Sequence, residues 1–172
     1  ALRSAVWRSA LRGRADNQAR ACAHVLTAQF PMLPERRLLA DGAAALERRF
    51  RGWAGRRFAA TAEFEEMIRR NREAMLVPGV AHSALEYYRW AARAQLRSEG
   101  RRFAEEVDRR SVVPVLQLHG ADDVTLLEAT ARESASWTGP RAVFHSLPDT
   151  GYFVHQEQPA TTTTTLTEFF TR

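Results

Sequence analysis

Residues 112–118, Val-Val-Pro-Val-Leu-Gln-Leu, form an apolar run of strand length in an otherwise helix-rich sequence. Such a run is typical of a strand that is buried on both faces of a sheet. A helical pattern follows over 126–137, a second strand pattern over 142–147 and a last helix over 159–170. Strand, helix, strand in this order predicts a right-handed parallel crossover. We therefore expect an α/β fold in the C-terminal part, with two parallel strands and flanking helices.

The first 110 residues carry helical rather than strand patterns. Apolar residues recur at helical spacing over 19–30, 43–53, 61–75 and 80–96, and a short helix is expected to end before Asp41 and Gly42. Thr61 is expected to cap its helix. The stretch 99–110 is polar and is interpreted as a linker to a different layer. The predicted division is a helical region over 1–110 and a strand-containing region over 111–172.

Composition narrows the possible partners. All 25 basic residues are arginine, and the net charge is +5. A nucleic-acid binder normally mixes lysine with arginine, and no known recognition module occurs, so we expect no nucleic-acid partner. No apolar run approaches the roughly 20 residues that span a bilayer. The single cysteine, Cys22, cannot form an internal disulfide, which favours a reducing cytoplasm; we interpret it as a small core residue on a helix.

Two loops at the ends of the predicted strands carry acid–base chemistry. Asp123 follows the first strand, at the edge of a parallel sheet where reactive groups collect. A carboxylate there can accept a proton from a histidine Nδ1 and orient the ring, or it can simply cap its own loop. His155 lies in the loop after the second strand. It is a candidate base, with a partner role toward Glu157 or the helix start as the alternative.

These loops resemble two motifs of the α/β-hydrolase superfamily, in its epoxide hydrolase and dehalogenase-like branch. The family pattern V-P-x-L-x-L-H-G-x-x-D corresponds to 113–123, and G-H-F-x-H-x-E-x-P corresponds to 151–159. The resemblance implies that Asp123 is the acid of a catalytic triad. It also places the catalytic histidine at position 152, where this chain has Tyr152. A phenol with a pKa near 10 is a poor base at neutral pH.

The helical region resembles the cap, or lid, of the same family. Residues 87–90, Tyr-Tyr-Arg-Trp, are similar to a cap motif whose tyrosine donates a hydrogen bond to the epoxide oxygen. The resemblance implies this role for Tyr88 and a substrate-binding position for Tyr87 and Trp90. A second cap tyrosine is expected in a segment like L-Y-F-Q-x-P, but the matching position here is Thr27. The implied substrate is a small hydrophobic molecule, with no metal and no cofactor.

The family's nucleophile sits on a G-x-S-x-G or G-x-D-x-G elbow. Neither pattern occurs in the 172 residues, so we expect the N-terminal half of the family fold to lie outside this sequence. Two hypotheses follow from the residues. Either the chain is the cap and C-terminal part of an epoxide hydrolase-like enzyme, or it is an inactive relic that keeps the fold. An unpaired strand edge at 112–118 also allows a homodimer.

Overall fold

The structure is a computed structural model that describes residues 18–107, 112–135 and 138–171. Contacts divide the chain into two compact units. The helical unit comprises Cys22–Gly52 and the described part of Thr61–Asp108. The strand unit comprises Trp53–Ala60 together with the described parts of Ala1–Ala21 and Arg109–Arg172. The segment Trp53–Ala60 thus joins the strand unit, although it lies within the region assigned to the cap from the sequence.

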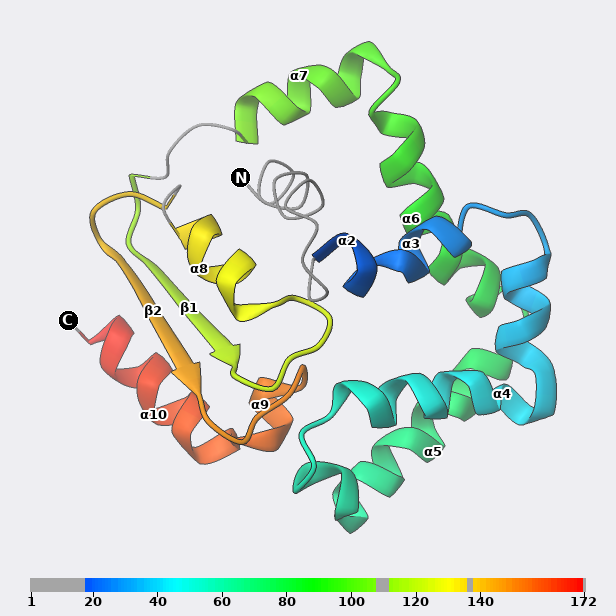
Figure 1. Cartoon of the computed structure of the whole chain (residues 1–172), viewed down its shortest axis with the longest axis horizontal. Helices are drawn as coiled ribbons and strands as arrows, with labels where there is room; N and C mark the ends of the chain where they lie inside the picture. The colour runs from blue at the N-terminus through cyan, green and yellow to red at the C-terminus, as the bar shows by residue number, and fades with distance from the viewer. Residues whose placement is uncertain (1–17, 108–111, 136–137, 172) are drawn as a thin grey trace. The chain divides into compact units, whose positions relative to one another are not determined.

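The strand unit is built on two parallel strands, β1 (Val115–Gly120) and β2 (Ala142–Leu147), paired in register from Val115–Ala142 to Gly120–Leu147 (Figure 1). Helix α8 (Glu128–Ala135) connects them and packs on both strands. Helices α9 (Val154–Glu157) and α10 (Pro159–Phe170) pack on β1. The parallel crossover predicted from the sequence is confirmed, and the mostly helical chain with this small sheet is consistent with an α/β fold.

The first strand begins later than its apolar run suggested. β1 starts at Val115, whereas Val112 is 91% exposed. Pro114 cannot donate a backbone hydrogen bond to a sheet ladder, which explains why pairing begins after it. Within the described residues, β1 and β2 pair only with each other. Homodimerisation through an unpaired strand edge therefore stays a prediction.

Two short elements complete the strand unit: α2 (Gln18–Ala21) and the 3-10 turn η1 (Phe58–Ala60). Gln18 is completely buried. Its side-chain amide donates to the Thr125 carbonyl at 2.5 Å and accepts from the Leu127 N–H at 2.8 Å. The beginning of the described chain is thereby tied to the loop between β1 and α8. The buried apolar residues of this unit include Ala131, Leu147 and Phe153.

The helical unit contains α3 (Ala23–Thr27), α4 (Leu33–Trp53), α5 (Ala62–Leu76), α6 (Val80–Ala94) and α7 (Ser98–Val107) (Figure 1). Helix α4 is interrupted at Ala40–Ala43, where Asp41, Gly42 and Ala43 have positive φ. The predicted end of a helix before Asp41 is therefore confirmed. The Thr61 hydroxyl accepts a hydrogen bond from the Phe64 N–H at 3.1 Å, which confirms the predicted N-cap.

Two expectations for this unit were wrong. The polar stretch 99–110 is not a plain linker, because α7 occupies most of it. The apolar pattern over 80–96 predicted a helix that buries an apolar face as far as Leu96, but α6 ends at Ala94 and Leu96 is 83% exposed. The residues that α6 buries are Ala81, Leu85 and Arg89, spaced by four. The arginine replaces an apolar residue in this pattern, so the stripe could not be found from hydrophobicity alone.

Candidate functional site

The loops that follow the two strands lie against each other in the strand unit. The Ala121 N–H donates to the Leu147 carbonyl at 2.9 Å, and the Asp122 N–H donates to the Thr150 carbonyl at 2.8 Å. Because both strands are parallel and in register, their carboxyl ends lie at one edge of the sheet. We call residues 121–123 the acidic loop. This loop and the Gly151 turn are adjacent in space, although Asp123 and Gly151 are 28 residues apart in the sequence.

Asp123 is half-buried and uses one oxygen to close its own loop. Its Oδ1 accepts from the Thr125 N–H at 2.7 Å, the Thr125 hydroxyl at 2.7 Å and the Leu126 N–H at 3.2 Å. This is the loop-capping arrangement given above as the alternative role of this residue. Capping and orienting a base are compatible, because the hydrogen bonds fix the carboxylate at the end of β1 while Oδ2 takes no part in them.

The turn after β2 is anchored by Glu157, at the end of α9. Its Oε2 accepts from the Gly151 N–H at 2.7 Å and the Gly55 N–H at 3.1 Å, and its Oε1 accepts from the Phe153 N–H at 3.1 Å. The Tyr152 N–H donates to the Trp53 carbonyl at 2.9 Å. One carboxylate therefore joins the turn, α9 and the segment Trp53–Ala60. The anchoring role of Glu157 has one signal in the sequence, which is its position six residues after Gly151 in the motif over 151–159.

Glu157→Ala is expected to lower the free energy of unfolding by about 2–3 kcal/mol, because it leaves three partly buried backbone N–H groups without an acceptor. Urea denaturation followed by tryptophan fluorescence measures the change. Glu168→Ala, an exposed position on α10, is the matched control and should change stability by less than about 0.5 kcal/mol. Equal effects of the two substitutions would show that the carboxylate does not anchor the turn.

Tyr152, in the turn, and His155, in α9 and not in the loop expected from the sequence, both lie at the surface. Tyr152 is 48% exposed, and its ring packs against Trp53 at 5.3 Å and Phe153 at 5.2 Å between centroids. His155 is exposed, and among the described residues its side chain forms no hydrogen bond or ion pair. The carboxylate of Glu157 binds backbone N–H groups, not the imidazole. No hydrogen bond thus joins Asp123, in the loop after β1, to His155, in α9.

The three aromatic residues proposed for substrate binding lie on α6 of the helical unit. Tyr88 is half-buried, with its ring edge-on to His24 at 5.9 Å and to Tyr87 at 5.8 Å. Tyr87 and Trp90 are 72% and 59% exposed. The solvent-facing rings give the helix an aromatic surface, whereas Tyr88 is held by its neighbours. Cys22 is half-buried at the start of α3.

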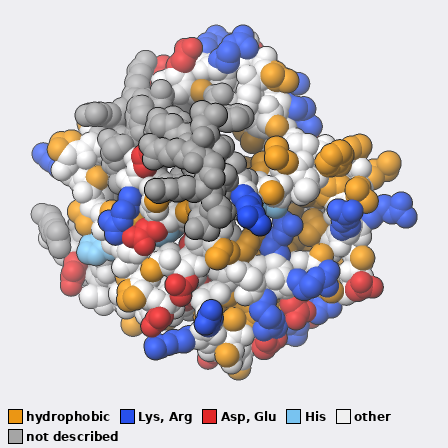
Figure 2. All heavy atoms as spheres, in the orientation of Figure 1, with side chains coloured by type: hydrophobic (Ala, Val, Ile, Leu, Met, Phe, Trp, Pro, Cys, Tyr) orange, Lys and Arg blue, Asp and Glu red, His pale blue; other side chains and the backbone are white. Residues whose placement is uncertain are grey.

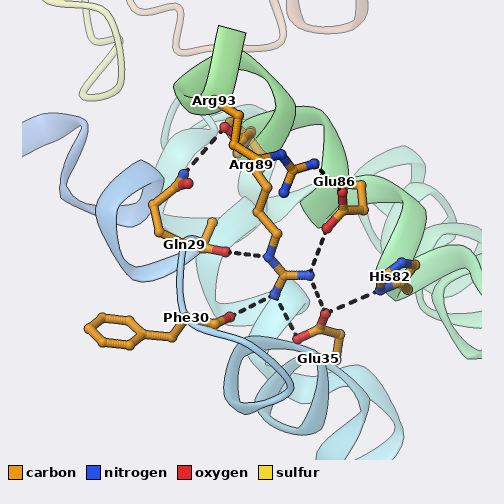
Figure 3. Close-up of polar contacts among 9 residues, drawn as sticks. Gln29, Phe30, Glu35, His82, Glu86, Arg89 and Arg93 are labelled. Carbon is orange, nitrogen blue, oxygen red and sulfur yellow. Dashed lines mark hydrogen bonds and ion pairs between the residues drawn. The ribbon is translucent and has the colours of Figure 1, made fainter. Parts of the chain in front are cut away.

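Arg89, next to Tyr88, is the centre of a polar cluster that the sequence did not reveal (Figure 3). Only 7% exposed, it donates to both oxygens of Glu35 at 2.6 and 3.0 Å, and to the carbonyls of Ala28 at 2.9 Å and Phe30 at 2.7 Å. The hydrogen bonds from Arg89 lower the pKa of Glu35 from its ordinary value of 4.5 to about 2. The cluster fastens the α3–α4 segment, including the Thr27 region, to the helix that carries Tyr88.

His119 is a second residue that sequence reasoning did not single out by itself. It is 4% exposed in β1, and its ring lies 5.9 Å from Phe144. Its Nε2 is buried and has no hydrogen-bond partner among the described residues. The signal available in the sequence was a histidine inside an apolar strand, which reads equally well as a packed core residue.

The described part of the chain contains no cluster of three or more His, Cys, Asp or Glu side chains that could hold a metal ion. No helix within it is both long and apolar enough to cross a bilayer.

No protein-family model matches this sequence, and no curated protein is similar to it. Among solved structures, the chain is similar to Cfl2 wild-type from Burkholderia cenocepacia, with a TM-score of 0.65 and 16% sequence identity. The match covers 89% of this chain and 49% of Cfl2, so this chain spans about half the length of that protein. At this identity the likeness shows a shared fold and nothing more.

Proposed function

We propose that this chain is the cap and C-terminal part of an α/β-hydrolase of the epoxide hydrolase-like branch, without the nucleophile elbow. The observation that carries the proposal is the contact between the acidic loop and the Gly151 turn, through the Asp122 N–H and the Thr150 carbonyl. In a hydrolase of this type, the triad acid and the histidine occupy these two loops. The helical unit is the proposed lid, and the strand unit carries the last two strands of the proposed core.

Each candidate residue has a distinct role in this proposal. Asp123 orients the base and stabilises its protonated form. Tyr88 donates a hydrogen bond to the oxygen that becomes an alkoxide when an epoxide opens. Tyr87 and Trp90 contribute apolar surface to a small hydrophobic substrate. The nucleophile comes from sequence outside these 172 residues, so the coding sequence upstream of Ala1 is expected to contain a G-x-S-x-G or G-x-D-x-G elbow.

The second candidate is an inactive relic of the same fold, and one observation favours it. The position that the family pattern gives to its histidine is Tyr152, which packs on Trp53 in a turn anchored by Glu157. The backbone of this turn is bonded on both sides, to Trp53 and to Glu157, which works against a local shift that would bring His155 toward Asp123. Fold and ligand binding would then survive without catalysis.

Tyr152→His, made in the natural protein with its upstream sequence, distinguishes the two candidates. If the relic proposal is right, the unmodified protein turns over neither epoxides nor esters above the uncatalysed background, and the histidine variant exceeds that background by at least about 100-fold through general-base catalysis. Tyr152→Phe is the matched control and should give no gain. Turnover by the unmodified protein would reject the relic, and loss of that turnover in His155→Ala would identify His155 as the base.

A further inference from the structure

The end of α3, its connection to α4 and the start of α4 present an exposed apolar surface. Of the 17 large apolar residues that are exposed in the described chain, five lie within residues 26–39, which we call the apolar segment. They are Leu26, Phe30, Met32, Leu33 and Leu39, at 70%, 60%, 73%, 46% and 42% exposure. Figure 2 shows hydrophobic side chains gathered over this part of the chain, with basic side chains beside them at the start of α4. Contiguous apolar surface rimmed by polar groups marks interaction surfaces in proteins.

Met32, the most exposed of the five, has an unusual backbone conformation. Its φ of 58° lies in the left-handed region, which bulky residues seldom adopt. The backbone is fixed on both sides of it, because Arg89 donates to the Phe30 carbonyl at 2.7 Å and the Met32 carbonyl accepts from the Arg36 N–H at 3.0 Å. Strained conformations of this kind persist where the surrounding structure imposes them, and they concentrate at functional sites. The fold therefore holds an apolar side chain out at the surface.

Two arginines within the apolar segment carry positive charge without a carboxylate partner. Arg36 and Arg37 are exposed, and among the described residues their side chains form no hydrogen bond or ion pair. Arg69 on α5, by contrast, pairs with two glutamates. The one acidic residue in the sequence of the segment is Glu35, whose side chain is 15% exposed and whose two oxygens are both bound by Arg89. The segment thus combines apolar side chains with positive charge.

We propose that the apolar segment docks on the surface of an anionic lipid bilayer. Leu26, Met32 and Leu33 enter the boundary between headgroups and acyl chains, and Arg36 and Arg37 pair with lipid phosphates. The contact is peripheral and needs no spanning helix. Hot spots of protein interfaces are enriched in Trp and Tyr, with Leu under-represented, so the mainly aliphatic composition favours lipid over a protein partner. None of these side chains is a proposed substrate-binding residue, so the inference does not depend on the proposed hydrolytic activity.

The test measures co-sedimentation of the full chain with vesicles of phosphatidylcholine alone or of an equal mixture with phosphatidylglycerol. We expect binding to the mixed vesicles to be at least about tenfold tighter and to weaken as added salt screens the charges. Arg36→Gln and Arg37→Gln should each weaken this binding about fivefold, the contribution of one arginine near an anionic surface. Leu26→Gln and Met32→Asn should each weaken it about tenfold, because each withdraws one apolar side chain from the bilayer. Asparagine is tolerated at a positive φ, so Met32→Asn keeps the backbone.

Leu96→Gln and Arg48→Gln are the matched controls, because both residues are exposed in the helical unit and lie outside the apolar segment. Both variants should bind the mixed vesicles like the unmodified chain, and thermal melting checks that every variant folds. Equal binding to both kinds of vesicle, or equal losses in test and control variants, would overturn the proposal. Binding by this chain but not by the natural protein with its upstream sequence would also overturn it, as would self-association that Leu26→Gln abolishes without any vesicle binding, since each result assigns the surface to a protein contact.

Discussion

Gly151→Ala is expected to lower the free energy of unfolding by about 3 kcal/mol, at the upper end of the usual effect of overpacking. A Cβ at this position would overlap the Trp53 carbonyl oxygen and lie 2.8 Å from the Ala54 carbonyl carbon. All of its close neighbours are backbone atoms, including the Gly55 nitrogen, so no side chain can rotate away to make room. Urea denaturation measured by near-ultraviolet circular dichroism gives the stability.

The matched control is Gly52→Ala, one residue before Trp53 in α4. A Cβ there has no heavy atom within 4 Å, and alanine is the better helix former, so this variant should be more stable by about 0.5–1 kcal/mol. Gly120→Ala should behave like Gly151→Ala, since its Cβ would overlap the backbone of Thr150 and Gly151. A Gly151→Ala variant as stable as the unmodified chain would mean that the turn does not pack against the Trp53–Ala60 segment.

Elements with a local cause were predictable from the sequence. β2 and α10 have the predicted bounds, because an apolar strand pattern and a proline at a helix start act within a few residues. The Thr61 cap is equally local, since its hydroxyl reaches an N–H only three residues ahead. The proximity of the two motif loops also followed from the sequence, because parallel strands place their carboxyl ends together.

The interactions that shape the candidate site arise from long-range contacts, which leave little trace in local patterns. Gly55 and Glu157 are 102 residues apart in the chain, and Gln18 and Leu127 are 109 apart. Nothing in the residues around Gly55 indicates that its N–H meets a distant carboxylate. Arg89 was missed for a related reason, because a charged residue on a buried helix face is recognised only through its partners Glu35, Ala28 and Phe30.

Arg89→Met is expected to lower the Tm of the chain by about 10 °C, because truncating one partner of a buried ion pair leaves the other charge unpaired. The methionine keeps most of the aliphatic volume, but the Glu35 carboxylate and the Ala28 and Phe30 carbonyls lose their donor. Arg93→Met is the matched control one turn along α6. Its side chain is half exposed and pairs only with Glu86 among the described residues, so the Tm of this variant should fall by no more than about 2 °C.

The pH dependence identifies the ion pair as the cause. Because Arg89 lowers the pKa of Glu35 from 4.5 to about 2, the pair contributes its full stability above pH 4.5 and loses it as the pH falls toward 2. Without Arg89, the carboxyl returns toward its ordinary pKa and this contribution disappears. The Tm difference between the unmodified chain and Arg89→Met should therefore shrink steadily between pH 4.5 and pH 2. A difference that stays constant over this range would assign the loss to packing of the arginine stem instead of its charge.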